Sequence, residues 1–315
     1  MLEALSHFKN PHFDLVFCGG TCLSKAYKLI RRMSEDIDFK VIVKHGVEFP
    51  SKNQLRKALK ELVSNIQIIL KEKGFVEELI QKTSKDENKY NRFEISYTSV
   101  FDQKSEALRP HLLLEFNFTE IQTSTIEAKL TTLMEDVRNA TSNVYGAVKA
   151  GDGPIISCIS LEEAVSEKLV SFSRRLIKQL DKHHELPIKE ALSADNGWDP
   201  ALVRHLYDVY EILGKTQVNL IYADILIGVI KKDQQDFKNQ DQRFVENPIG
   251  QLQKALELSQ YGQVSELLEK QYKQFVSDMV YAETVPTYHE ALACFSNALL
   301  SNLPISPPNK SRSIP

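Results

Sequence analysis

The chain has 315 residues, of which 42% are hydrophobic and 26% charged, and its formal net charge is −3. This composition fits an ordinary globular protein of one large or two smaller domains, and it excludes a strong overall attraction to nucleic acid. No apolar run approaches the roughly 18 residues of a membrane span, and the opening MLEALSHFKNPHF lacks the apolar region of a signal peptide. We therefore expect a cytoplasmic protein without a membrane segment.

The four cysteines show neither a CxxC pair nor a Cys/His ligand pattern. They are Cys18, Cys22, Cys158 and Cys294. Cysteines without such spacing are usually small buried residues in a reducing compartment. We therefore expect four buried thiols.

The first half of the chain mixes strand and helix patterns. FDLVFC, at 13–18, is a short apolar run that ends in two glycines, which is typical of a buried strand. Residues 21–32 carry an apolar face of helical spacing, and DIDFKVIV at 36–43 has the pattern of a strand. The remaining predicted elements are a helix over 53–72, strands over 75–82, 91–101 and 110–118, and a polar turn between the first two of these strands.

From about residue 160 the pattern becomes helical. Ser160, with Glu163 three residues later, is a typical start for a helix. Further helical patterns lie near 199–214, 216–231, 248–258, 263–280 and 286–300. The sequence thus predicts an α+β protein, with a mixed α/β region over 1–150, a helical region over 151–303 and a flexible tail over 304–315.

The strand at 36–43 carries two carboxylates on one face. Because side chains alternate along a strand, Asp36 and Asp38 point to one side, while Ile37 and Phe39 point to the other and can fill a core. Two carboxylates this close repel each other unless a cation lies between them, and their hard oxygens suit Mg²⁺ or Mn²⁺. The alternative is a strand edge that carries solvated charge.

Gly19 and Gly20 lie between the strand at 13–18 and the helix predicted after it. Glycines at this place let backbone N–H groups approach a phosphate, and a helix N-terminus adds positive potential. Thr21 can cap the helix and offer a hydroxyl. No Gly-Lys-Ser/Thr sequence and no GxGxxG pattern is present, so the stretch is neither a Walker A loop nor a dinucleotide site.

A third carboxylate occurs on the strand predicted at 110–118. Glu115 shares a face with Leu113 and Asn117, whereas the apolar residues between them lie on the other face. Burial of a carboxylate without a partner is costly, so we expect a cation or a hydrogen-bond donor beside Glu115. The alternative is an exposed carboxylate at the edge or end of a strand.

The stretch GGTCLSKAYKLIRRMSEDIDF resembles the AbiEii/AbiGii (MenT-like) toxin family of the DNA polymerase β-type nucleotidyltransferase superfamily. The matching residues are Gly19, Gly20, Thr21, Leu23, Lys25, Arg32, Ser34, Asp36, Ile37 and Asp38. Two later segments resemble further family motifs in the family's order, LEEAVSEKLVSFSRR with Lys168 and RHLYDVYEI with Asp208. His205 stands where the family often has an aspartate, so the resemblance gives a role to Asp208 and none to His205.

The resemblance implies a nucleotidyltransferase-type mixed sheet followed by helices, and a Mg²⁺-dependent transfer of a nucleotide from a nucleoside triphosphate to an acceptor. It also implies a bacterial toxin with a separately encoded antitoxin, which need not bind the toxin directly. In some relatives the acceptor is the tRNA 3′ end. The implied catalytic residues are Asp36, Asp38, Glu115, Lys168 and Asp208, with the metal on Asp36 and Asp38. The implied nucleotide-binding residues are Gly19, Gly20, Thr21, Lys25 and Lys168.

The helical patterns give Lys168 and Asp208 different surroundings. Lys168 falls within an apolar stripe, so its ammonium must extend to solvent or find anionic partners. Asp208 lies off the stripe of its helix, and the pattern alone favours solvent. Arg204, one turn earlier, is an alternative partner for Asp208. We expect Arg174 and Arg175 to be solvated or structural, and the alternative is a contact with RNA or nucleotide phosphate.

Positive charge gathers in the sequence around the predicted site, at Lys25, Lys28, Arg31, Arg32, Lys40 and Lys44. Such charge suits triphosphate and RNA phosphate alike, and no stacked-aromatic RNA motif accompanies it. Two alternatives therefore stay open. One is a nucleotidyltransferase whose acceptor is a small molecule or a protein side chain, and the other is an inactive fold that binds a nucleotide or a partner.

Overall fold

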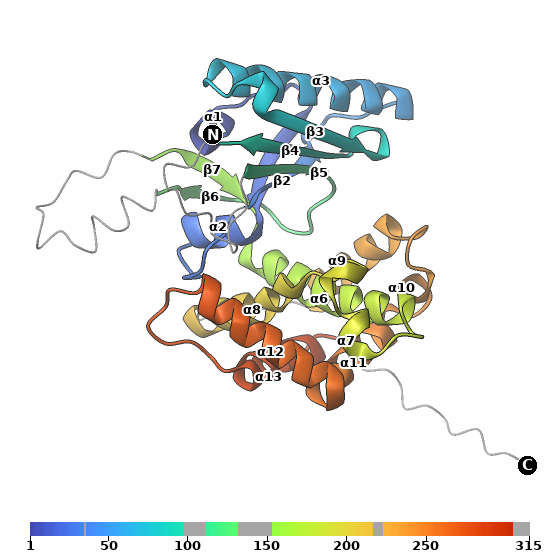
Figure 1. Ribbon diagram of the computed structural model, residues 1–315. Coiled ribbons are helices and arrows are strands. Elements are labelled where there is room, and N and C mark those ends of the chain that lie inside the picture. Colours follow the sequence, from blue (N-terminus) through green and yellow to red (C-terminus); the bar gives the residue numbers. More distant parts are fainter. Residues whose placement is uncertain (35, 98–110, 132–152, 217–222, 305–315) are drawn as a thin grey trace, which may run out of the picture. The chain divides into compact units, whose positions relative to one another are not determined.

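The computed structural model describes residues 1–34, 36–97, 111–131, 153–216 and 223–304 (Figure 1). Its contacts divide the chain into two compact units. The sheet unit comprises Met1–Ser160 and Ser277–Thr284, and the helical unit comprises Leu161–Val276 and Val285–Pro315. The predicted domain boundary at 150 and nearly all of the predicted tail lie outside the described residues.

The sheet unit contains a mixed sheet of seven strands in the order β3-β4-β5-β2-β1-β7-β6. The strands are β1 (Phe13–Cys18), β2 (Asp36–Val43), β3 (Ile80–Lys85), β4 (Tyr90–Ser96), β5 (His111–Phe118), β6 (Ile126–Lys129) and β7 (Ile155–Cys158). β2 pairs antiparallel with β1 and parallel with β5, while β1 also pairs parallel with β7. This sheet, together with the helices, confirms the predicted α+β class.

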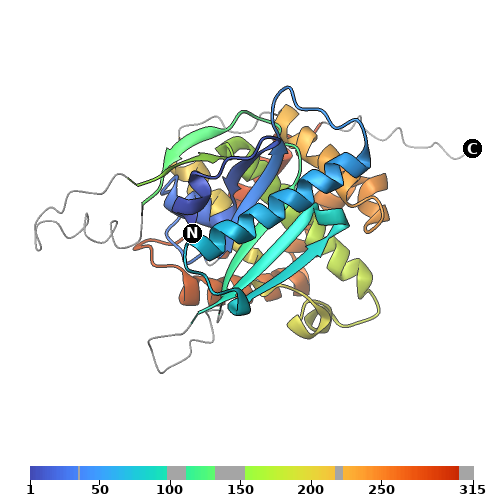
Figure 2. The ribbon, with the colours of Figure 1, turned by 90° about the horizontal axis from the view of Figure 1, so that it is seen from above.

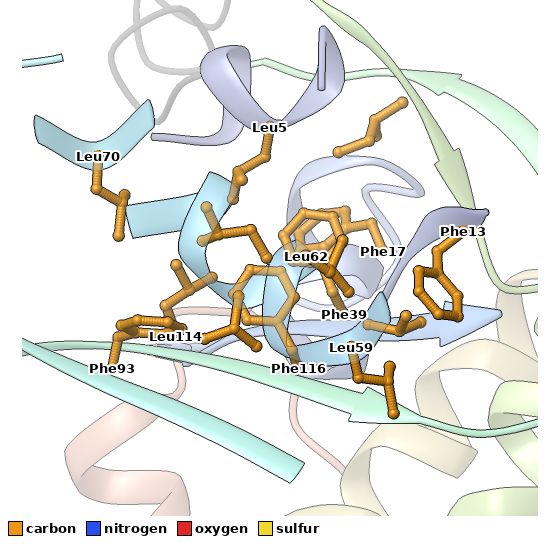
Figure 3. Close-up of a cluster of buried hydrophobic side chains, with 14 of the residues drawn as sticks. Leu5, Phe13, Phe17, Phe39, Leu59, Leu62, Leu70, Phe93, Leu114 and Phe116 are labelled. Carbon is orange, nitrogen blue, oxygen red and sulfur yellow. The ribbon is translucent and has the colours of Figure 1, made fainter. Parts of the chain in front are cut away.

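Helix α3 (Lys52–Glu72) covers one face of the sheet (Figure 2). The short helix α1 (Leu2–Ser6) adds Leu5 to the same core. Buried side chains drawn in Figure 3 include Leu59, Leu62 and Leu70 of α3 and Phe17, Phe39, Phe93 and Phe116 of the strands. Because side chains alternate along a strand, this core fixes the opposite face of the sheet as the polar one.

The predicted helix over 21–32 is shorter than expected. The structure has only α2 (Gly19–Lys25) there. Lys28 takes a left-handed backbone conformation with φ of 57°, which a continuing α-helix does not allow. Farther on, Arg32 forms an isolated β-bridge with Val280.

The predicted strand over 75–82 also shifts along the chain. It begins at Ile80, after a 3₁₀ turn over Glu77–Leu79, and continues through polar residues to Lys85 because each of these residues pairs with β4. The chain reverses at Asp86–Asn88, where all three residues have positive φ. Strands β6 and β7 escaped prediction because four residues are too few for an alternating pattern.

All four cysteines are free thiols. Cys22 and Cys158 are buried as expected, whereas Cys18 and Cys294 are partly exposed. Cys18 ends β1, where its thiol donates a hydrogen bond to the Asp38 carbonyl oxygen at 3.5 Å. The expectation of four buried thiols is therefore wrong for two of them.

In the helical unit, α6 (Leu161–Lys182) contacts α7, α8, α9 and α11. The other helices are α7 (Ile188–Ala191), α8 (Arg204–Lys215), α9 (Ala223–Asp236), α10 (Gln242–Glu246), α11 (Pro248–Gln260), α12 (Gly262–Met279) and α13 (Tyr288–Leu300). Helices α8, α11, α12 and α13 agree with the sequence patterns, whereas α7 and α10 are too short to show one. The helix predicted over 216–231 falls partly on residues 217–222, outside the described ones, and α9 covers its remainder from Ala223 and continues to Asp236. Within the described part of the chain, no helix has both the length and the apolar character to cross a membrane.

Candidate active site

The polar face of the sheet brings three carboxylates onto neighbouring strands. Asp36 and Asp38 alternate with Phe39 along β2, and Phe39 is buried in the core. The register pairs Asp38 directly with Glu115 of β5, and neighbouring strands lie about 4.8 Å apart. Glu115 therefore stands beside Asp38, on the neighbouring strand from which the sequence predicted a third carboxylate.

Glu115 has the hydrogen-bond donor that its strand position predicted. The Tyr90 hydroxyl on β4 donates to Oε1 of Glu115. Burial, together with the Glu115 carboxylate, raises the pKa of Tyr90 above its usual value, so the hydroxyl keeps its proton and can donate. Arg92 stands opposite Glu115 in the β4–β5 register, and its guanidinium binds Glu94 at 2.9 Å.

Tyr90 and Arg92 were not selected from the sequence. The alternation in YNRFEIS puts both on the face opposite Phe93, which is buried in the core. That alternation was the available signal. It shows which face a residue occupies, but it does not show that β4 pairs with β5.

Gly19 and Gly20 are glycines because other side chains of the site occupy the space that a Cβ would need. Gly19 has φ of +74°, and a Cβ there would lie 2.1 Å from Oδ2 of Asp38. A Cβ on Gly20 would lie 2.5 Å from the Arg32 guanidinium and 2.7 Å from the Ser34 hydroxyl. The glycine pair therefore lets Asp38, Arg32 and Ser34 approach the backbone of α2.

Thr21 does not cap the helix as predicted. The N-cap of α2 is Cys18, so the glycine pair lies in the first turn of the helix and not in a loop before it. The Thr21 hydroxyl lies 2.5 Å from the Asp36 carbonyl oxygen and 3.0 Å from the Ser34 hydroxyl. These bonds tie α2 to the start of β2, and a contact of Thr21 with phosphate stays a prediction.

Asp36 and Asp38 are the residues that could hold a divalent cation. Their oxygens suit Mg²⁺, which is commonly held by one or two carboxylates and completes its shell with water and substrate phosphates. Within the residues that the structure describes, no three His, Cys, Asp or Glu side chains form a complete protein-only metal site. Two carboxylates would leave most of the coordination shell to water and substrate phosphates, and a metal at this place stays a prediction.

The basic residues near the site differ in how far they can reach a ligand. Arg32 and Lys40 are only 3% and 5% exposed, so they contribute internal charge and not a positive surface. Lys44 pairs with Asp14 at 3.5 Å. Lys25, in the last turn of α2, stays partly exposed, and its predicted contact with the nucleotide stays a prediction.

In the helical unit, Lys168 of α6 and Asp208 of α8 form a buried ion pair. Nζ of Lys168 lies 2.7 Å from Oδ2 of Asp208, and the side chains are 9% and 0% exposed. The solvent position that the helical pattern favoured for Asp208 is therefore wrong. Helix α8 packs against both α6 and α13, so residues outside its main apolar stripe are covered as well.

His205, three residues before Asp208, lies among positive charges. Burial, with the charges of Lys168 and Arg204, lowers the pKa of His205 well below its usual value, and Asp208 opposes this only in part. Nδ1 of His205 is buried without a hydrogen-bond partner among the described residues. The imidazole is therefore neutral at pH 7.

Comparison with known proteins gives a family match over both units. A family model described as nucleotidyl transferase AbiEii toxin, type IV toxin–antitoxin system, matches residues 2–294. Among solved structures, the chain is similar to MenT4, a nucleotidyltransferase toxin from Mycobacterium tuberculosis H37Rv. The two chains share 14% identity, with a TM-score of 0.43 over 96% of this chain and 91% of that one. No curated protein matches this chain significantly.

Proposed function

The chain belongs to the AbiEii family of nucleotidyltransferase toxins from type IV toxin–antitoxin systems, and from that premise we propose that it transfers nucleotides from a nucleoside triphosphate to the 3′ end of tRNA. Family membership implies a triphosphate substrate and an antitoxin partner. The observation that carries the proposal is the register that sets Glu115 beside Asp38, with Asp36 on the same strand. Carboxylates on adjacent strands suit metal-assisted nucleotidyl transfer.

In this proposal, the sheet unit supplies the reacting centre. The acceptor hydroxyl would attack the α-phosphorus of the triphosphate, and pyrophosphate would leave as the bond between the α- and β-phosphates breaks. Asp36 and Asp38 would hold Mg²⁺, which would supply positive charge to the phosphates during this in-line displacement. Glu115 would accept the proton of the acceptor hydroxyl, and its bond from Tyr90 would orient it for this step. The triphosphate would contact Gly19, Gly20, Thr21 and Lys25.

The helical unit would contribute Lys168, which would neutralise the triphosphate, and Asp208, which would orient Lys168. The 2.7 Å ion pair supports the orienting role because it fixes the ammonium in one position. The neutral imidazole of His205 adds no positive charge beside the ammonium.

The tRNA acceptor and a cytoplasmic location rest on the family likeness. A small molecule or a protein side chain would be the acceptor in the rival enzyme hypothesis, which uses the same carboxylates. An inactive fold that binds nucleotide is the rival from another class. The antitoxin need not bind the toxin directly for any of these hypotheses.

A transfer assay separates the acceptors. The protein is incubated with Mg²⁺ and each labelled nucleoside triphosphate in turn, together with total RNA, total protein or a small-metabolite pool. We expect label on tRNA with at least one triphosphate. Label that appears only on protein or on a small metabolite would overturn the tRNA acceptor while leaving the enzyme class intact.

The double variant Asp36→Asn with Asp38→Asn tests whether this pair performs the chemistry. Loss of several kcal/mol of transition-state stabilisation corresponds to a decrease in transfer rate of about 10³-fold or more. Asp14→Asn, an exposed carboxylate on β1, is the matched control and should transfer nucleotide at the wild-type rate. Full transfer, or full growth inhibition in cells, by the double variant would exclude catalysis through the pair.

A further inference from the structure

A second basic site lies within the helical unit, at the C-terminal half of α6. It is a pocket of about 390 Å³ whose lining includes the basic residues Arg174, Arg175, Lys178 and Lys182 and the aromatic residues Trp198 and Phe237. The sequence predicted that the two arginines are solvated or structural, with a contact to RNA or nucleotide phosphate as the alternative. The pocket shows that four positive side chains of one helix converge on one concave surface.

Two of these residues form the wall of the pocket. Arg174 is 7% exposed, binds Asp233 at 3.1 Å, and stacks with its guanidinium 3.6 Å from the centre of the Phe237 ring. Trp198 is 5% exposed, and its indole N–H donates to Gln271 at 3.0 Å. Because these polar groups are already bonded, they fix the shape of the pocket and leave ligand contacts to other residues.

The remaining basic residues can reach a ligand. Among the described residues, Lys178 and Lys182 have no ion-pair partner, and both are at least partly exposed. Arg175 forms an ion pair with Asp199 at 3.4 Å, and both side chains are more than a third exposed. Burial and the charges of Arg204 and Arg174 lower the pKa of Arg175, against the opposing effect of Asp199. Positive charge in the pocket is therefore only partly neutralised.

The basic residues of the pocket recur along one side of α6. Lys168, Arg175 and Lys182 recur every seven residues, so they lie on one side of α6, two helical turns or about 10.5 Å apart. No acidic residue occupies the positions of that side between them, which are Ser171, Phe172, Lys178 and Gln179. Asp208 already neutralises the buried Lys168, so the cations that a ligand can reach are those at the pocket. A concave surface with several such cations suits the backbone phosphates of a nucleic-acid strand.

We infer that Arg175, Lys178 and Lys182 bind a backbone phosphate of the acceptor RNA and form a subsite separate from the reacting centre. The inference rests on the proposed function, because RNA is the acceptor in both. It adds the residues that bind the acceptor strand at a phosphate other than those at its 3′ end. The subsite contributes affinity for RNA and not to the chemical step.

The test compares RNA binding by the wild-type protein and by Lys178→Gln with Lys182→Gln. Fluorescence anisotropy of labelled tRNA is followed between about 50 and 200 mM salt, where phosphate contacts show as a slope of affinity against salt. We expect the double variant to bind about tenfold more weakly and to lose about 0.7–0.9 of that slope per lost contact. The KM for tRNA should rise while kcat stays at the wild-type value.

Two matched variants isolate the pocket from general charge. Lys231→Gln with Lys270→Gln removes the same charge from exposed lysines of the helical unit that do not line the pocket, and it should bind RNA as the wild type does. Lys178→Arg with Lys182→Arg keeps the charge and should restore binding. Thermal unfolding of each variant confirms that the fold is retained.

The outcomes separate failure of this inference from failure of the proposed function. If the pocket variant and the surface control bind tRNA equally while the wild type still labels tRNA, the subsite is excluded and the proposed function stands. A fall in kcat without a change in RNA affinity would also exclude the subsite. If the wild type neither binds nor labels RNA, both fail together. If inorganic phosphate competes for the pocket as strongly as a short RNA strand does, the ligand is a free anion, and the inference of an RNA subsite is overturned.

Discussion

The two sets of charged residues in this protein differ in what they need for stability. In the sheet unit, Asp36, Asp38 and Glu115 place like charges on neighbouring strand positions of a partly exposed face. In the helical unit, Lys168 and Asp208 place opposite charges 2.7 Å apart in a buried position. An added cation would stabilise the first set, whereas the charges of the second set neutralise each other.

Because of this difference, removal of a carboxylate should affect stability very differently in the two units. Removal of a carboxylate from the sheet set removes a proposed metal ligand, so nucleotide transfer should fall. It also reduces the repulsion between like charges, so the loss of stability should be small. Removal of the carboxylate from the helical pair leaves a buried ammonium without its counterion. Stability measurements therefore distinguish like charges on a partly exposed face from opposite charges that stabilise each other in a buried position.

The largest expected effect on stability is that of Asp208→Asn. It removes the Asp208 carboxylate from the buried Lys168 ammonium, and breaking a buried ion pair in this way costs about 3–5 kcal/mol. We expect the free energy of unfolding, measured by urea titration, to fall by that amount. Asp36→Asn should lower it by less, because the Asp36 side chain is half-buried whereas that of Asp208 is fully buried.

A double variant shows whether the loss comes from the unpaired charge. Lys168→Met with Asp208→Leu removes both charges from the same buried space, and replacement of a buried ion pair by apolar residues is often neutral. We expect it to recover most of the stability lost in Asp208→Asn. If Asp208→Asn is as stable as Asp36→Asn, the two sets do not differ in the way described.

The sequence allowed the face of each carboxylate to be predicted, but not every neighbour. Alternation along β2 and β5 correctly assigned Asp38 and Glu115 to faces opposite the core, because period two follows from strand geometry alone. The register that pairs them joins segments 77 residues apart and has no local signal. Asp208 was misplaced for a related reason, since helical periodicity does not show that α8 has neighbours on two sides.

The glycine pair shows a second limit of local patterns. A phosphate contact was predicted for Gly19 and Gly20 from their place between strand and helix. The structure gives another reason for them, since Asp38, Arg32 and Ser34 pack where Cβ atoms would be. That packing depends on the chain's return over α2 after residue 31, which cannot be derived from the residues of the turn itself.

Gly19→Ala sharpens the comparison by disturbing the sheet set without removing a charge. A Cβ at φ of +74° costs about 2 kcal/mol of stability, and it would also displace the Asp38 carboxylate, 2.1 Å away. We expect a moderate fall in the midpoint of urea unfolding, with nucleotide transfer falling at least tenfold if about 1.4 kcal/mol of transition-state stabilisation is lost.

Gly46→Ala is the matched control for this variant. Gly46 has φ of +79°, but nothing lies within 4 Å of a Cβ there. Its backbone cost should equal that of Gly19→Ala, while nucleotide transfer should stay at the wild-type rate. Equal activity of the two alanine variants would show that the position of Asp38 does not limit the reaction.

The smallest expected effect is a pH dependence of stability that comes from His205, beside the helical pair. Burial and the charges around His205 hold its pKa well below the usual value of about 6.5, so the folded state stays neutral while the unfolded chain takes up a proton. Below about pH 6.5 the unfolded state binds more protons than the folded state. The free energy of unfolding therefore falls by about 1.4 kcal/mol for each pH unit below 6.5. Urea unfolding at about pH 7.5 and 5.5 should show this loss, and His205→Gln should reduce it by about 1.4 kcal/mol at the lower pH. An unchanged pH dependence in His205→Gln would mean that this imidazole is not held neutral by the fold.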